Sequence, residues 1–156
     1  MALVRGIPPR WTRPFAEGLD VEAVNSHIRA WQEVLGLLDW EIRFSPAALD
    51  AETFRASHDM DSIHRRGAIR LSADAPTSQV DRLIVHELLH ALMAQMEDTL
   101  NRATDDLGAD ARAFLKGQWE RSQEWVIERL ASLITGTDWQ AFHDDPVWET
   151  AFPVVD

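Results

Sequence analysis

Apolar residues recur every three or four positions within residues 20–38, which is the spacing of one helix face. The positions are Val21, Val24, Ile28, Trp31, Val34 and Leu35. Asp20 can accept hydrogen bonds from the first free N–H groups, and Gly36 favours the left-handed turn that ends a helix. The pattern therefore predicts a first helix.

Strict alternation follows in "DWEIRFSP", residues 39–46, which predicts a half-buried strand stopped by Pro46. "GAIRLS", residues 67–72, predicts another strand. The pattern of residues 47–66 is ambiguous: we expect a further strand around Phe54, and then a loop.

A buried helix is predicted after Pro76. Thr77 or Ser78 can cap it, and Asp81 three residues after Ser78 suggests a capping box. Apolar residues lie nearly all around the helix over residues 80–96, so this helix should occupy the middle of the domain.

Polar residues dominate 97–117, which contain Gly108 and Gly117, and we expect this stretch to loop out. Residues 118–134 predict an amphipathic helix. Its apolar face comprises Trp119, Val126, Ile127, Leu130, Leu133 and Ile134.

Together these elements predict an α+β domain over residues 20–137, in which a small antiparallel or mixed sheet packs on the buried helix. Residues 1–19 are expected to form an irregular N-terminal arm, and residues 138–156 a C-terminal tail packed on the domain.

Composition narrows the possible partners. The chain has 156 residues and a formal net charge of -11, so we expect binding neither to nucleic acid nor to an anionic membrane surface. It has no cysteine, so a metal would need nitrogen and oxygen ligands. The first residues lack an apolar signal core and no apolar run could span a bilayer, which makes a cytoplasmic location the expectation.

The candidate chemistry lies in "HELLH", residues 86–90. His86 and His90 are one helical turn apart, so both can direct a ring nitrogen to the same point. Glu87 is about 100° round the helix, beside that point. Two imidazoles with a flanking carboxylate can bind a metal ion and take a proton from a water that the metal activates. The alternative is a pair of core histidines, which would also require the buried Glu87 to be paired.

This motif resembles that of the zincin metallopeptidases, and the order of elements is similar to a minimal zincin-like fold. The likeness is to small phage- and prophage-encoded proteins of the gluzincin type, in which a glutamate is the third ligand. It covers roughly residues 20–134 and implies bound Zn²⁺ and a peptide or protein substrate.

The third ligand must come from elsewhere, since a catalytic zinc normally has three protein ligands. Glu124, followed by Val126 and Glu128, resembles the gluzincin ligand pattern, so we predict Glu124. Glu120 and Glu128 remain alternatives, because a helical wheel places Glu120 nearest the apolar face and Glu128 farthest from it. Asp138 is a weaker candidate. In the preferred arrangement, Glu128 orients a ligand histidine.

The resemblance implies peptide hydrolysis with Glu87 as general base. It also implies that "AIRLS" is an edge strand that binds extended peptide. An oxyanion donor is expected among His58, His64, Arg65, Arg66 and His143, without a choice between them. His27 is expected to serve packing or to lie on the surface.

The alternative function is a zincin-fold metal-binding or interaction module without peptidase activity. In such a module, Asp138 or His143 could close the fourth metal position.

Overall fold

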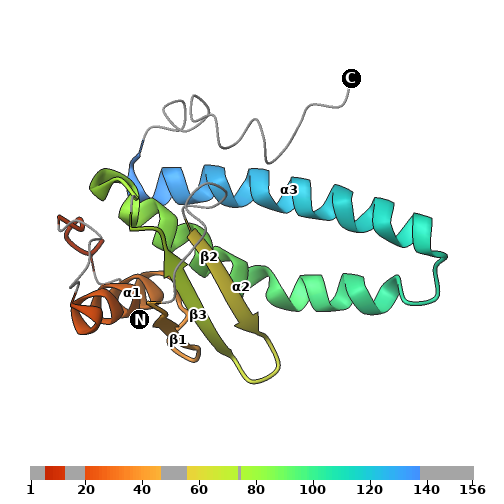
Figure 1. The fold of residues 1–156 in the computed structure, drawn as a ribbon, viewed down its shortest axis with the longest axis horizontal. Helices are drawn as coiled ribbons and strands as arrows, with labels where there is room; N and C mark the ends of the chain where they lie inside the picture. The colour runs from red at the N-terminus through yellow and green to blue at the C-terminus, as the bar shows by residue number, and fades with distance from the viewer. Residues whose placement is uncertain (1–5, 13–19, 47–55, 74, 138–156) are drawn as a thin grey trace.

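The computed structural model describes residues 6–12, 20–46, 56–73 and 75–137. The chain has an α+β fold, as predicted (Figure 1). Its elements are α1 (Val21–Leu35), β1 (Glu41–Phe44), β2 (Ala56–Asp61), β3 (Arg66–Leu71), the 3₁₀ turn η1 (Thr77–Gln79), α2 (Val80–Ala103) and α3 (Ala109–Thr135).

The predicted first helix, α1, is confirmed together with both of its ends. The Asp20 carboxylate accepts hydrogen bonds from the backbone N–H groups of Glu22 and Ala23. Gly36 ends the helix with a φ of 73°, a left-handed conformation that costs glycine little. Trp31, on the inner face of α1, is 1% exposed.

The three strands form one mixed sheet in the order β1-β3-β2. β1 runs parallel to β3, and β2 runs antiparallel to β3. The expectation that "AIRLS" is an edge strand is therefore wrong, because β3 is paired on both sides. Within the described residues, β2 is an outer strand instead. The strand expected around Phe54 begins at Ala56, and Phe54 itself is outside the described residues.

The buried central helix is confirmed as α2, in which every residue from 80 to 91 is buried. The predicted cap is wrong, since no side chain of η1 or Gln79 caps α2. The Asp81 carboxylate instead accepts hydrogen bonds from the Trp11 backbone N–H at 2.9 Å and from the Trp31 indole at 3.0 Å. His27 also contacts this carboxylate, so its role is packing rather than surface.

Residues 97–117 do not loop out. α2 continues to Ala103 and α3 begins at Ala109, so only residues 104–108 connect the two helices. The two helices run antiparallel as a hairpin that projects beyond the sheet (Figure 1). Polar composition misled the prediction because polar residues do not break a helix, and Gly117 lies inside α3 at modest cost.

Antiparallel pairing of α2 and α3 positions the site. His86 contacts both Glu124 and Glu128, and His90 contacts Glu124. Residues four apart on one helix therefore meet residues four apart on the other.

Candidate metal centre

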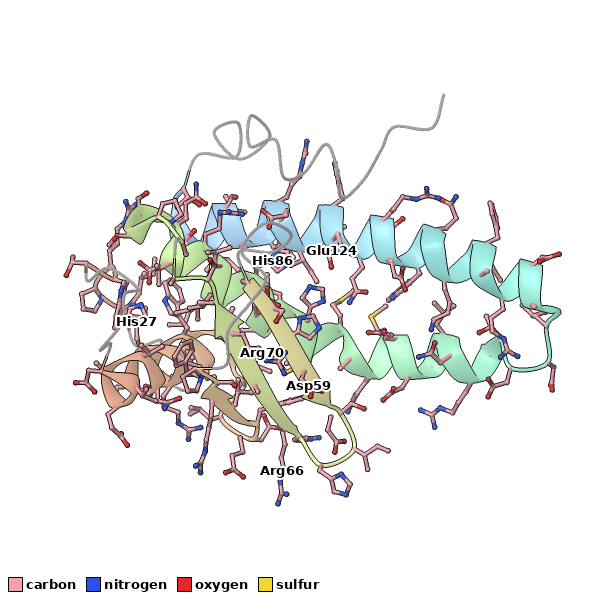
Figure 2. The ribbon with its side chains drawn as sticks, in the orientation of Figure 1. His27, Asp59, Arg66, Arg70, His86 and Glu124 are labelled. Atoms are coloured by element: carbon pink, nitrogen blue, oxygen red, sulfur yellow. The ribbon has the colours of Figure 1, made fainter. Side chains whose placement is uncertain are left out.

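His86, His90 and Glu124 converge between α2 and α3. His86 Nε2 lies 3.2 Å from Glu124 Oε2, and His90 Nε2 lies 3.1 Å from Glu124 Oε1. The two ring nitrogens are 3.2 Å apart. Figure 2 shows the labelled His86 and Glu124 side chains close together between the two helices. The three residues predicted as metal ligands are thus brought together around one point.

These separations fit a small tetrahedral ion. Two donors that each lie 2.0–2.1 Å from such an ion are about 3.3–3.4 Å apart. The two ring nitrogens are 3.2 Å apart, close to that spacing, and each lies 3.1–3.2 Å from one of the two oxygens of the Glu124 carboxylate. Two imidazoles and one carboxylate are also the donor set of many catalytic zinc sites. The residues present therefore fit Zn²⁺.

Of the two other candidate ligands on α3, Glu120 is exposed, whereas Glu128 is only 3% exposed. The wheel order, which made Glu128 the most exposed, is wrong. Glu128 Oε1 lies 2.6 Å from His86 Nδ1, an ion-pair distance without hydrogen-bond alignment. Glu128 therefore lies behind His86, one of the predicted ligands, which is the outer position expected for it.

The helical wheel ranked the three glutamates wrongly because the face of α3 that packs on α2 is largely polar. Gln123, Glu128, Ser132 and Thr135 are buried there, whereas Leu133 is 78% exposed. Ile127 and Ala131 are buried as well, so apolar residues alone do not mark the face that meets α2.

Arg82 pairs with Glu128 on the side away from His86, and nothing in the sequence pattern pointed to it. Its Nη1 lies 2.5 Å from Glu128 Oε2, and both side chains are almost fully buried. An arginine one turn before a motif histidine is the signal that could have identified it. Gln123 was also missed: its Nε2 lies 3.5 Å from His90 Nδ1. A histidine that binds metal through Nε2 carries its proton on Nδ1, so a half-turn of the Gln123 amide would present the oxygen that accepts it.

Carboxylates outnumber arginines at this centre, because Glu87, Glu124 and Glu128 lie near a single arginine, Arg82. Burial lowers the pKa of His86, but the Glu124 and Glu128 carboxylates outweigh it and raise that pKa to about 10. Burial raises the pKa of Glu124, but hydrogen bonds from His86 and His90 outweigh it and the net shift is downward. A divalent ion would supply the charge that protons otherwise supply.

Glu87 lies beside this centre and contacts β2. The His58 Nδ1 atom is 2.6 Å from Glu87 Oε2, and the His58 ring stacks on His90 with centroids 4.1 Å apart. His58, Glu87 and His90 form a second group close enough to share an ion. The 2.6 Å contact is that of a direct hydrogen bond and is too short for two ligands of one zinc, so this second group is better explained without metal.

The other expected oxyanion donors in the described residues lie away from the site. His64 pairs with Asp61, Arg65 with Asp39, and Arg66 with Glu41, and all three are exposed. His143 and Asp138 lie outside the described residues. The most exposed side chains of the site are Glu124, at 24%, and His58, at 29%.

No family model, curated protein or solved structure matches this chain. Among the residues that the structure describes, no helix has the length and apolar character needed to cross a membrane.

Proposed function

We propose that this chain is a zinc-dependent peptidase in which His86, His90 and Glu124 hold Zn²⁺ and Glu87 is the general base. The observation that carries the proposal is the mutual spacing of 3.1–3.2 Å among the three donor groups. The presence of Glu87 beside them supports catalysis, because a purely structural metal site has no use for a base.

When bound, zinc would polarise a peptide carbonyl and acidify a water molecule at its open position. Glu87 takes a proton from the attacking water and delivers it to the departing amine nitrogen, so the same carboxylate serves both halves of the hydrolysis. Burial of Glu87 keeps bulk water from competing for that proton.

The substrate class is a peptide in extended conformation. β2 pairs with β3 along one edge, and no described strand covers its other edge. An extended peptide could add to that edge through main-chain hydrogen bonds, close to Glu87. The net charge of -11 favours substrates that are not strongly acidic.

Metal analysis of the purified protein tests the site. We expect one zinc per chain, lost in His86→Ala and in Glu124→Ala. Glu120→Ala is the matched control, because Glu120 is exposed and lies one turn from Glu124 on the same helix. This variant should keep its zinc. Zinc binding that survives Glu124→Ala would move the third ligand elsewhere.

Glu87→Gln tests catalysis separately. This variant should keep zinc and lose cleavage of a dye-quenched unfolded protein. Cleavage that persists in Glu87→Gln would contradict the proposed role of Glu87. A wild-type protein that binds zinc but cleaves nothing would favour the metal-binding module.

A further inference from the structure

His58 lies in the middle of β2, opposite Ile69 of β3, and its side chain crosses to α2. There its Nδ1 is 2.6 Å from Glu87 Oε2. The Glu87 side chain is 5% exposed, so its carboxylate needs a partner within the protein. In the described part of the chain, His58 is the partner that the structure gives it.

We infer that His58 is a positioning residue that holds the Glu87 carboxylate in its working orientation, an inference that rests on the proposed peptidase function. A hydrogen bond to Oε2 fixes the plane of the carboxylate and leaves Oε1 to accept the proton of the attacking water. Because the partner is a carboxylate, His58 donates from Nδ1.

The stack on His90 gives His58 its own fixed orientation. The two rings are 4.1 Å apart between centroids and inclined by 28°. His90 is in turn held within α2, so the ring of His58 is fixed on one side by a proposed ligand and on the other by the base. This arrangement distinguishes His58 from the exposed His64 on the same hairpin.

Two substitutions separate the hydrogen bond from the stack. His58→Phe keeps an aromatic ring on His90 and removes the donor. His58→Asn removes the ring and keeps an N–H donor at about the position of Nδ1. His64→Phe is the matched control, because it places the same ring at an exposed position of the same hairpin.

The first readout is the binding of acetohydroxamate to the zinc-loaded variants, since its hydroxyl proton is one that Glu87 can accept. We expect His58→Phe to weaken acetohydroxamate about 10- to 100-fold, the equivalent of one hydrogen bond to a charged group. Zinc affinity, measured by competition with a chromogenic chelator, should change by less than about threefold because no ligand is removed. His58→Asn should restore most of the hydroxamate affinity.

Cleavage of a dye-quenched unfolded protein is the second readout, and kcat should fall in His58→Phe with KM little changed. Wild-type hydroxamate affinity in His58→Phe would overturn the inference. So would equal losses in His58→Phe and His58→Asn with parallel losses of thermal stability, which would make His58 a packing residue. Failure of wild-type protein to bind zinc, or full hydroxamate affinity in Glu87→Gln, would instead overturn the proposed function.

Discussion

Glu128→Leu removes the carboxylate that lies between Arg82 and His86, and its cost can be worked out from burial. The Arg82 and Glu128 side chains are 2% and 4% exposed. Removing one partner of such a buried pair costs about 3–5 kcal/mol, because the remaining charge keeps its desolvation penalty without this compensation. The metal-free protein should therefore lose about that much unfolding free energy.

The double variant Arg82→Met, Glu128→Leu should behave differently. Replacing both charges by apolar groups of similar volume is often neutral or stabilising, so stability should return to within about 1 kcal/mol of wild type. Zinc affinity should not return, because His86 still lacks the group behind Nδ1. Loss of such an outer partner typically lowers metal affinity about 10- to 100-fold.

Urea unfolding with a chelator present measures the unfolding free energy without the stabilisation that zinc itself would add. Competition with a chromogenic chelator measures the zinc affinity. Two results would refute the reasoning: a cost below about 1 kcal/mol in Glu128→Leu, or full zinc affinity in the double variant. The first would mean that the ion pair is not effectively buried, and the second that Glu128 does not act on His86.

Three further outcomes are expected. Asp81→Ala should lower the unfolding free energy by about 1.5–3 kcal/mol in urea, because Asp81 accepts hydrogen bonds from Trp11 and Trp31 within the core. Burial raises the Asp81 pKa, but hydrogen bonds from His27 and from the two tryptophan N–H groups outweigh it and lower that pKa. The stabilisation by Asp81 should therefore be present above pH 3.8 and lost as the pH falls further. If the unfolding free energy of the variant falls at acid pH as steeply as that of wild type, this account is contradicted. The pKa of His86 is raised from 6.5 to about 10, so charged His86 should stabilise the metal-free protein fully below pH 6.5 and lose that effect as the pH rises through 10. Urea midpoints should fall over this window in wild type and not in His86→Asn. Asp20→Ala should cost about 1 kcal/mol through loss of the α1 cap, measured by thermal unfolding with the exposed Glu22→Ala as control; an equal effect in both variants would contradict the cap.

Several features that depend on a few neighbouring residues were predicted correctly, although the predicted N-terminal cap of α2 was not. The ends of α1 depend on Asp20 and Gly36, and the alternation in β1 depends on its own residues. The single-turn spacing of His86 and His90 likewise follows from the helical period. Each of these features depends on hydrogen bonds and steric limits among residues that are close together in the sequence.

The contacts that complete the site were settled only by tertiary structure. Arg82 and Glu128 are 46 positions apart, and His58 and Glu87 are 29 apart. No periodicity relates such pairs, because their meeting depends on how α2, α3 and β2 pack. The inward face of α3 could not be predicted from apolar residues alone, since Gln123 and Glu128 are buried there beside partners on α2. The sequence by itself determined α1, the buried part of α2 and the HELLH motif. Packing determined which carboxylate faces the histidines, because a charged side chain can be buried only where another chain segment compensates it.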